Sequence, residues 1–217
     1  MHKKNAWSPY FSIAIATYNR PQLLKRAIES VSKQSFRDFE VIVVDDSLKG
    51  NSNKVVAGYP WVKYYKLKRN RGQAFAKNFA IVKAKGKFIT FLDDDDYYLK
   101  NHLETRAVLL KRHPSVKIIH GGFKVLGSPY VPDKNNPSKL IHIRKCVLGP
   151  TLVVDRKVFK AVGKFKLIKY AEDSEWYERA KLAGVSVLQT KKQTYVYDRK
   201  HNKNSITKSQ ELFWAKP

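Results

Sequence analysis

Short apolar runs alternate with segments of helical periodicity in the first half of the chain. Four compact runs rich in β-branched or aromatic residues are typical of buried strands, namely residues 11–15, 41–44, 62–67 and 88–92. Residues 21–34 and 72–84 carry apolar side chains at helical spacing, and Pro21 suits the first turn of a helix. This alternation predicts an α/β fold with a Rossmann-like, mostly parallel sheet flanked by helices.

The second half of the chain has a mixed pattern. Residues 101–112 and 171–183 have helical periodicity, and Gly184 suits the end of the second helix. Predicted strands follow a different spacing, and a loop rich in Gly, Pro and Asn separates the first two of them: residues 116–126, 140–154 and 185–188. We therefore expect a mixed arrangement of strands after Asp96.

Chain length limits the number of domains. With 217 residues, the chain can bury one sizeable core, is too short for two full domains, and shows no internal repeat or linker. We expect a single domain over residues 1–217. Its predicted parts are a first half (about 11–96), a mixed second half (about 97–198) and a basic tail (199–217).

Apolar patterning and cysteine content also bear on location. No apolar run approaches the roughly 18 residues that span a bilayer, so we expect no integral membrane segment. The basic N-terminus is not followed by an apolar stretch, unlike a secretory signal. A lone Cys146 cannot form an internal disulfide and is interpreted as a small hydrophobe. We expect a cytoplasmic protein, in a bacterium or a phage-infected host, with peripheral membrane association as a second option.

Charge changes the picture of the partner. Lys and Arg number 43 against 18 Asp and Glu, which gives a formal net charge of +25. Residues 47–92 contain eleven basic residues and no acidic one. Such a surface indicates a polyanionic partner. The acidic residues are concentrated instead, since ten of the 18 fall in three clusters, at 45–46, 93–96 and 172–178.

The first two acidic clusters follow directly on predicted strands. In a parallel sheet both would emerge at the carboxyl edge, where open α/β sheets bind ligands. Four consecutive aspartates repel one another unless a cation is shared, and Mg²⁺ or Mn²⁺ binds one or two carboxylates together with substrate phosphates. The alternative is a solvated acidic turn that caps the next helix. The pairing of two clusters favours a metal-assisted site for a phosphate-bearing substrate.

The third cluster lies at a predicted helix N-terminus. Acidic residues are favoured there by the helix dipole, so capping alone would account for Glu172 and Asp173. The alternative is a carboxylate opposite the metal site that acts as a general base within hydrogen-bond reach of an acceptor hydroxyl.

These motifs occur in one recognisable order. The sequence resembles the family 2 glycosyltransferases of the GT-A fold from Ser12 to about Gly184. The matching segments are 12–20 (SIAIATYNR), 40–47 (EVIVVDDS), 70–72 (NRG), 77–78 (KN), 86–89 (GKFI), 91–96 (FLDDDD), 162–165 (VGKF) and 172–173 (ED).

The resemblance implies roles for particular residues. The first half would bind the nucleotide-sugar donor, favoured as a UDP-sugar, through nine residues: Thr17, Tyr18, Arg20, Asp45, Asp46, Arg71, Lys77, Asp93 and Asp94. Asp93 and Asp95 would hold Mn²⁺ or Mg²⁺, with His201 as a further candidate ligand. Asp173 would be the catalytic base, with Glu172 and Trp176 on the acceptor side. The implied reaction is an inverting, single displacement at the sugar C1.

Two departures from the family pattern matter. After Asp46 the chain reads Ser47-Leu48-Lys49-Gly50-Asn51 instead of a small-residue turn that ends in Asp, so contacts to the base would differ in detail. No Arg-Trp pair occurs, although processive members carry one. We therefore expect one sugar to be transferred per encounter.

The acceptor has to be inferred from charge. The net charge of +25 favours DNA, with a hydroxymethylated base of the phage type as the alcohol, and basic residues interleaved with Trp61, Tyr64 and Tyr65 would support it. The alternative is an anionic cell-envelope polysaccharide or lipopolysaccharide acceptor reached at the membrane face. Only Leu212, Phe213 and Trp214 would then serve as a C-terminal membrane anchor.

Two more distant classes share some of these features. A metal-dependent nuclease would also combine clustered carboxylates with a basic groove, although the motif order opposes it. A noncatalytic DNA-binding module would not concentrate carboxylates at strand ends. The absence of a G-x-G-x-x-G or P-loop motif disfavours a dinucleotide enzyme or an NTPase.

Overall fold

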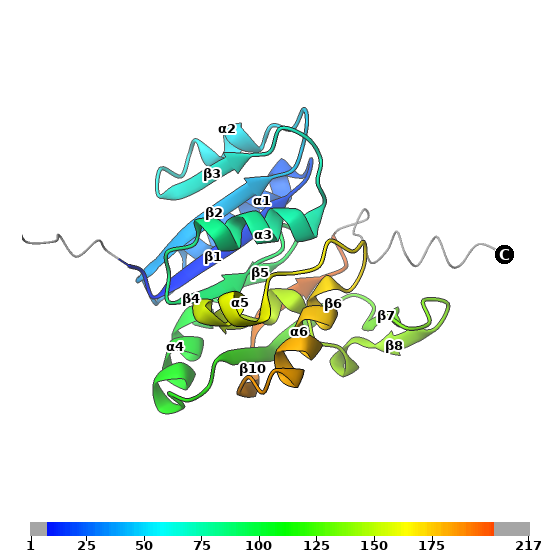
Figure 1. The fold of residues 1–217 in the computed structure, drawn as a ribbon. Coiled ribbons are helices and arrows are strands. Elements are labelled where there is room, and N and C mark those ends of the chain that lie inside the picture. Colours follow the sequence, from blue (N-terminus) through cyan, green and yellow to red (C-terminus); the bar gives the residue numbers. More distant parts are fainter. Residues whose placement is uncertain (1–7, 202–217) are drawn as a thin grey trace, which may run out of the picture.

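The computed structural model describes residues 8–201 (Figure 1). Over these residues the main sheet has eight strands in the order β3-β2-β1-β4-β9-β6-β10-β5, and β7 and β8 form a separate antiparallel pair. The strands are β1 (Phe11–Thr17), β2 (Phe39–Asp45), β3 (Val62–Lys66), β4 (Phe88–Phe91), β5 (Tyr97–Tyr98), β6 (Ile118–Leu126), β7 (Tyr130–Pro132), β8 (Leu140–His142), β9 (Val153–Asp155) and β10 (Val187–Asp198).

Strand direction divides the sheet into two regions. Strands β3, β2, β1 and β4 are all parallel, which the alternating pattern predicts. Strand β9 then runs antiparallel to both β4 and β6, β10 is parallel to β6, and β5 closes the edge antiparallel to β10. The predicted α/β fold, with a mostly parallel sheet and a mixed second half, is confirmed.

Helices cover both faces of the sheet. Alternate residues of each central strand point to opposite faces, so Ile13 and Val41 pack in one apolar core while Ala14 and Ile42 pack in the other. The first core is covered by α1 (Pro21–Ser32), α2 (Ser52–Val56) and α4 (His102–Arg112). The second is covered by α3 (Gln73–Lys83), α5 (Arg156–Val162) and α6 (Glu172–Leu182).

The structure differs from the sequence prediction in several places, most of them in the second half. The predicted strand at 140–154 is wrong, because it divides into β8, two short 3₁₀ turns (Ile143–Lys145 and Gly149–Thr151) and β9. Pro150 has no N–H for a sheet hydrogen bond and starts the second turn. The last strand, predicted to end at Leu188, continues to Asp198 and contains a register shift between Thr190 and Tyr195. The residues at this shift are mostly polar and do not alternate with apolar ones, so the pattern does not indicate a strand there. Helices α2 and α5 were not predicted, since each is only two turns or shorter.

Some expectations concern the chain ends. The predicted tail at 199–217 and the anchor residues Leu212, Phe213 and Trp214 lie outside the described residues, except for 199–201. The N-terminal segment considered as a secretory signal falls on residues 1–7, which lie outside as well. Within residues 8–201, no helix has both the length and the apolar character needed to cross a bilayer.

Candidate active site

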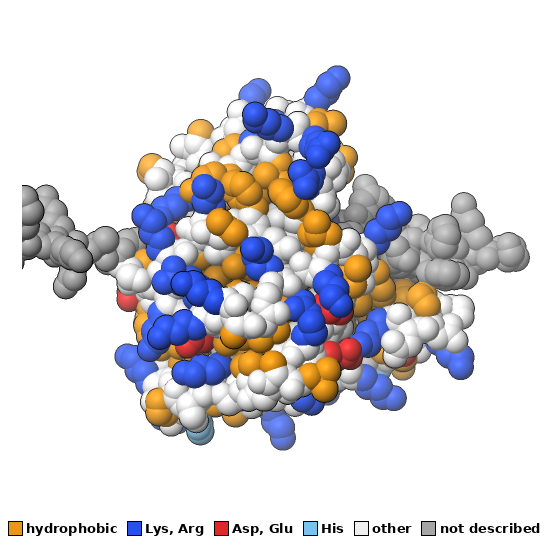
Figure 2. Space-filling model, in the orientation of Figure 1, with side chains coloured by type: hydrophobic (Ala, Val, Ile, Leu, Met, Phe, Trp, Pro, Cys, Tyr) orange, Lys and Arg blue, Asp and Glu red, His pale blue; other side chains and the backbone are white. Residues whose placement is uncertain are grey.

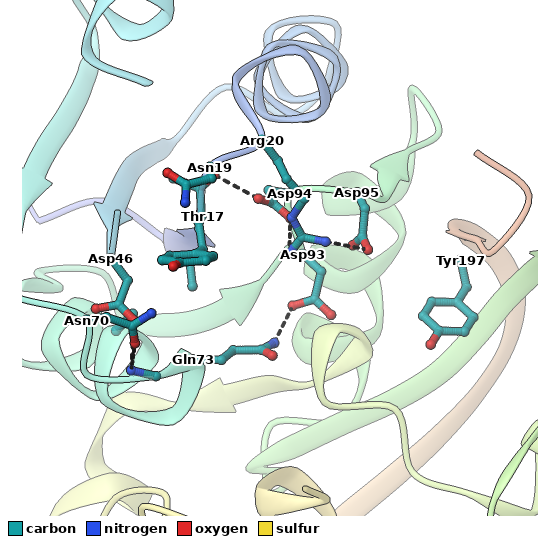
Figure 3. A pocket seen from close by; sticks show the side chains of 14 residues that line it. Thr17, Asn19, Arg20, Asp46, Asn70, Gln73, Asp93, Asp94, Asp95 and Tyr197 are labelled. Atoms are coloured by element: carbon teal, nitrogen blue, oxygen red, sulfur yellow. Dashed lines mark hydrogen bonds and ion pairs between the residues drawn. The ribbon is translucent and has the colours of Figure 1, made fainter. Parts of the chain in front are cut away.

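The first two acidic clusters meet at one edge of the sheet. Thr17 at the end of β1 lies beside Asp45 at the end of β2, and the Asp46 N–H donates to the Thr17 carbonyl oxygen at 2.9 Å. The aspartates at 93–96 follow the neighbouring strand β4. A cavity of about 400 Å³ opens between them (Figure 3), lined by Ala16, Thr17, Tyr18, Asn19, Arg20, Asp46, Asn70, Gly72, Gln73, Ala76, Asp93, Asp94, Asp95 and Tyr197.

Asp45 and Asp46 have different surroundings. Asp46 lines the cavity, and its two carboxylate oxygens accept hydrogen bonds from the backbone N–H groups of Arg71 and Gly72, each at 2.7 Å. Gly72 has φ of +84°, a conformation that glycine adopts without strain, just before α3. Asp45 is fully buried, accepts from Ser47 N and Tyr64 Oη, and does not line the cavity. Asp46 therefore faces the cavity, whereas Asp45 hydrogen-bonds within the turn that follows β2.

Arg20 and Thr17 both contact Asp94, the second of the four consecutive aspartates at 93–96. Thr17 Oγ1 donates to Asp94 Oδ2 at 2.7 Å, and Arg20 Nη2 lies 2.9 Å from Asp94 Oδ1. A second arm of the guanidinium, Nη1, reaches Asp95 Oδ2 at 3.2 Å. Burial raises the pKa of Asp94 to about 7, and the charge of Arg20 opposes that rise. The predicted donor residues Thr17, Arg20 and Asp94 thus form one connected group.

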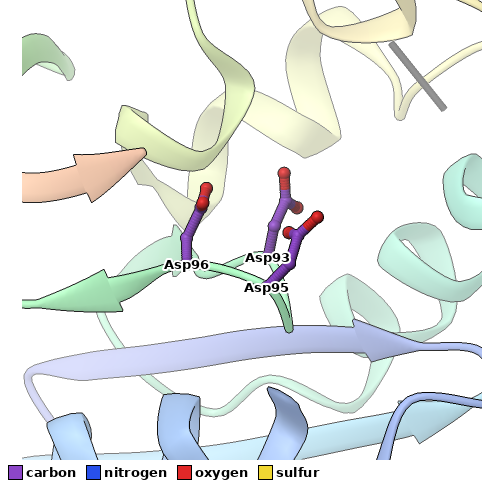
Figure 4. Close-up of side chains that lie close together, drawn as sticks. All are labelled: Asp93, Asp95 and Asp96. Atoms are coloured by element: carbon purple, nitrogen blue, oxygen red, sulfur yellow. The ribbon is translucent and has the colours of Figure 1, made fainter. Parts of the chain in front are cut away.

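Three carboxylates converge at this edge. One oxygen each of Asp93, Asp95 and Asp96 lies within 4.8 Å of the others (Figure 4). Asp96 is fully buried, and its oxygens accept from Tyr195 Oη and from the Asp198 N–H. Burial raises the pKa of Asp96 well above its ordinary value. Oxygen donors in this number could hold Mg²⁺ or Mn²⁺, and the partly exposed Asp93 and Asp95 are the candidate ligands.

His201 and Arg71, two further predicted site residues, contact other side chains than these three carboxylates. The Nδ1 atom of His201 is 2.8 Å from Asp198 Oδ2, and the same carboxylate accepts from Arg26 at 2.6 Å. A ligand role for His201 would therefore fall to its Nε2 atom. Arg71 is exposed, its guanidinium stacks over the Phe75 ring at 4.0 Å, and it is not among the residues that line the cavity.

A second cavity of about 650 Å³ adjoins the first. The two share Gln73, Asp93 and Tyr197 in their walls. Lys77 lines the second cavity at this boundary and is almost fully buried, with Nζ 3.6 Å from Asp93 Oδ1 and 3.3 Å from Glu172 Oε1. One ammonium group thus joins the carboxylate cluster of β4 to the acidic start of α6.

Asp173 faces the second cavity from the first turn of α6. Its Oδ2 accepts from the Gly149 N–H at 2.6 Å and its Oδ1 from the Ser174 N–H at 2.8 Å. Burial, together with the neighbouring charge of Glu172, raises the pKa of Asp173 to about 6. The preceding Ala171 has φ of +58°, a left-handed conformation that is uncommon for a residue with a Cβ and that recurs at functional sites.

The acceptor-side expectation for Trp176 is corrected. Its ring is fully buried, stacks on Phe159 and donates from Nε1 to the Gly163 carbonyl oxygen, so it belongs to the core. Tyr177, one position further on the helix, lines the cavity instead and contacts His120 through its hydroxyl. A helical residue at i+4 from Asp173 shares its face, and this spacing could have identified Tyr177.

Comparison with known proteins agrees with this geometry. The family model described as "Glycosyl transferase family 2" matches residues 12–170. An uncharacterized glycosyltransferase of Rickettsia typhi is 27% identical over 198 residues, which cover 84% of this chain and 62% of that protein. The Escherichia coli UDP-Glc:alpha-D-GlcNAc-diphosphoundecaprenol beta-1,3-glucosyltransferase WfgD is 29% identical over 154 residues, covering 67% and 60%.

A solved structure has a similar fold. The crystal structure of Staphylococcus aureus TarS 1-349 in complex with UDP-GlcNAc has a TM-score of 0.71 and 26% identity, over 89% of this chain and 59% of that one. The present chain therefore spans about three fifths of the length of the two relatives and of the TarS 1-349 chain. With its family-model match over residues 12–170, the chain belongs to glycosyl transferase family 2.

Proposed function

We propose that this chain transfers a single sugar from a UDP-sugar, with inversion, to a hydroxyl of an anionic cell-envelope glycan. The observation that carries the proposal is the pair of joined cavities, with Asp93 in the walls of both and Asp173 in the wall of the second alone. A sugar bound between them would have a diphosphate on one side and an acceptor hydroxyl on the other. Proximity and orientation of this kind supply a large part of catalysis.

The donor half of the proposed site comprises residues from about 11 to 96. Thr17, Tyr18, Arg20 and Asp46 would surround the nucleotide, and TarS, which binds UDP-GlcNAc in its crystal structure, supports uridine. Asp93 and Asp95 would hold Mn²⁺ or Mg²⁺, which when bound offsets the charge that grows on the leaving diphosphate. His201 stays a candidate ligand, since the Asp198 carboxylate against Nδ1 matches the usual support of a metal-binding imidazole.

The acceptor half comprises residues from about 97 to 198. Asp173 would take the proton of the acceptor hydroxyl, and a pKa of about 6 leaves it ionised at neutral pH while keeping it basic enough to do so. Lys77 would stay charged between Asp93 and Glu172, because those carboxylates favour the ammonium form. A single in-line displacement by the acceptor hydroxyl would invert the anomeric carbon.

The relatives support an envelope acceptor over DNA. WfgD and a Campylobacter jejuni relative, 39% identical over 103 residues (45% of this chain, 33% of that protein), are named as glucosyltransferases that act on undecaprenol-diphosphate-linked glycans. A lipid diphosphate is an anion, so an acceptor of this kind would account for part of the excess of basic residues in this chain. Hydroxymethylated DNA is the second candidate, because the net charge of +25 suits any polyanion. Family membership opposes the nuclease alternative.

A transfer assay read by mass spectrometry tests the proposal. Nucleotide sugars with Mn²⁺ are offered against an undecaprenyl-diphosphate-linked sugar, hydroxymethylated DNA and plain DNA. We expect one added sugar on the lipid-linked acceptor only. Sugar on the hydroxymethylated base alone would overturn the acceptor assignment in favour of DNA, and nicking of plasmid DNA without transfer would overturn the whole proposal.

A further inference from the structure

The second cavity is bordered by exposed apolar side chains that the transfer reaction does not use. In the segment 164–170, which leads into α6, Leu167 is 62% exposed and Ile168 is 43% exposed. The β7–β8 hairpin, which also contributes residues to the cavity wall, exposes 58% of Leu140 and 49% of Tyr130. Single exposed apolar residues are ordinary, but these four lie on two segments that line one cavity. Such an arrangement indicates an interaction surface at the cavity mouth.

Fixed contacts hold the two segments in place. Phe165 is buried, and its backbone N–H and carbonyl oxygen both hydrogen-bond to the side-chain amide of Asn78 on α3, at 3.0 and 2.8 Å. Tyr170 Oη donates to the Pro132 carbonyl oxygen at 2.8 Å, which ties the segment to β7. Leu167 and Ile168 therefore lie exposed between two anchored positions, Phe165 and Tyr170. Neither side chain belongs to the two apolar cores of the described residues.

Basic side chains outnumber acidic ones around these residues, and the β7–β8 hairpin also contains Asp133. Residues 134–154 and 156–171 contain ten basic residues and no acidic one. Lys134 pairs with Glu178 and Lys166 with Glu175, both from α6. Several of the others are exposed, namely Lys139, Arg144, Lys145, Lys164 and Lys169. Figure 2 shows one face of the molecule, on which blue basic and orange hydrophobic side chains are interspersed and red acidic ones are few.

We propose that the segment 164–170 and the β7–β8 hairpin dock this chain on a membrane surface rich in anionic phospholipid. Leu167 and Ile168 would enter the headgroup region, and the surrounding lysines would contact lipid phosphates. Aliphatic side chains interleaved with cations match an interface that offers both hydrocarbon and anionic groups, whereas a nucleic acid backbone offers charge without hydrocarbon. Docking in this orientation would place the mouth of the Asp173 cavity at the membrane plane.

This inference deepens the proposed function and rests on it for the meaning of the cavity as an acceptor site. The two can fail separately, because vesicle binding is measured without donor or acceptor. Vesicle binding without any transfer activity would leave the docking surface standing and remove the proposed reaction. Transfer to a lipid-linked acceptor without vesicle binding through this surface would support the proposed reaction and overturn the docking surface.

A site-specific fluorescent label tests the docking surface. In a Cys146→Ser background, Ile168→Cys and, as a matched control, Val82→Cys on α3 are each labelled with an environment-sensitive dye. Val82 is 66% exposed and lies on a different element. With vesicles of phosphatidylcholine and phosphatidylglycerol, we expect a blue-shifted, brighter signal at 168 and none at 82. An equal response at both positions, or none at either, would overturn the proposal.

Sedimentation with the same vesicles gives a second readout. The paired change Leu167→Gln and Ile168→Gln should weaken partitioning by about tenfold, because two aliphatic groups no longer leave water. The control pair Val82→Gln and Leu182→Gln, whose residues are exposed on α3 and α6, should leave partitioning unchanged. Equal effects of the two pairs on vesicle partitioning would contradict the proposal. A label at position 168 that responds to duplex DNA but not to vesicles would contradict it as well.

Discussion

Gly149 is the glycine on which the geometry of the proposed base depends. A Cβ atom added there would lie 2.5 Å from Asp173 Oδ2 and 2.6 Å from Asp173 Cβ, closer than such atoms approach in proteins. The Gly149 N–H also donates to the same Oδ2 at 2.6 Å. Substitution Gly149→Ala therefore displaces the Asp173 carboxylate and weakens one of its two backbone hydrogen bonds.

The size of the effect follows from these distances. Ordinary contact for a Cβ begins near 3.4 Å, so the two groups must separate by about 1 Å, and a misplacement of that size costs roughly 10²-fold in rate. The donor cavity is lined by other residues and should keep its affinity. We predict a fall in kcat of about 10²-fold at a nearly unchanged KM for the donor. Loss of the hydrogen bond should also move the acid limb of the pH profile upward, because the Gly149 N–H lowers the pKa of Asp173.

The matched control is Gly58→Ala. A Cβ at position 58 would lie 3.5 Å from the Val55 carbonyl oxygen, an ordinary contact, and far from the proposed site in sequence and fold. Steady-state kinetics and thermal unfolding are measured on both variants. A folded Gly149→Ala enzyme with the kcat of the Gly58→Ala control would refute the positioning role of Gly149.

Three further predictions test other parts of the account. Activity should fall as pH drops through about 6, because protonated Asp173 cannot accept the hydroxyl proton, and a kcat–pH profile without that limb would contradict the assignment. Asp95→Ala should weaken Mn²⁺-dependent UDP binding at least tenfold by calorimetry and leave metal-free UDP binding unchanged; equal Mn²⁺ dependence in the variant would exclude Asp95 as a ligand. Glu40→Gln should destabilise the fold by about 2–3 kcal/mol in urea unfolding, since buried Glu40 accepts from Lys63 Nζ at 2.6 Å. The pKa of Glu40 is lowered in the folded state, so the stability difference between wild type and Glu40→Gln should shrink as pH falls through that pKa. A stability difference that does not change with pH would show that the charge of Glu40 is not its source.

The strands and helices of the first half could be predicted because their apolar patterns are unambiguous. Buried parallel strands read as continuous apolar runs, and the carboxyl ends of β1, β2 and β4 then place Thr17, Asp46 and Asp93 at one edge by topology alone. The family motifs add the identity of the ligand that such an edge would bind. The placement of these side chains could therefore be predicted from the sequence, and their role in donor binding stays a prediction.

The acceptor side could not be predicted to the same depth. Its residues come from loops whose course depends on long-range packing, such as the contact of Tyr170 with Pro132. Trp176 and Tyr177 are adjacent aromatics, and Trp176 enters the core against α5. The i+4 spacing from Asp173 identifies Tyr177 as the cavity residue only once Asp173 is placed at the cavity. Gly149 carries no sequence signal for its contact with Asp173, because the two are brought together by the turn before β9.

The most direct test of the central claim compares the wild-type chain with Asp173→Asn. Transfer from a UDP-sugar to the undecaprenyl-diphosphate-linked acceptor and binding of UDP with Mn²⁺ are measured on the same preparations. The account predicts that transfer falls by at least 10³-fold, an order of magnitude typical of removing a general base, while donor affinity stays within about twofold. An Asp173→Asn variant that transfers sugar at the wild-type rate would contradict the assignment of the base.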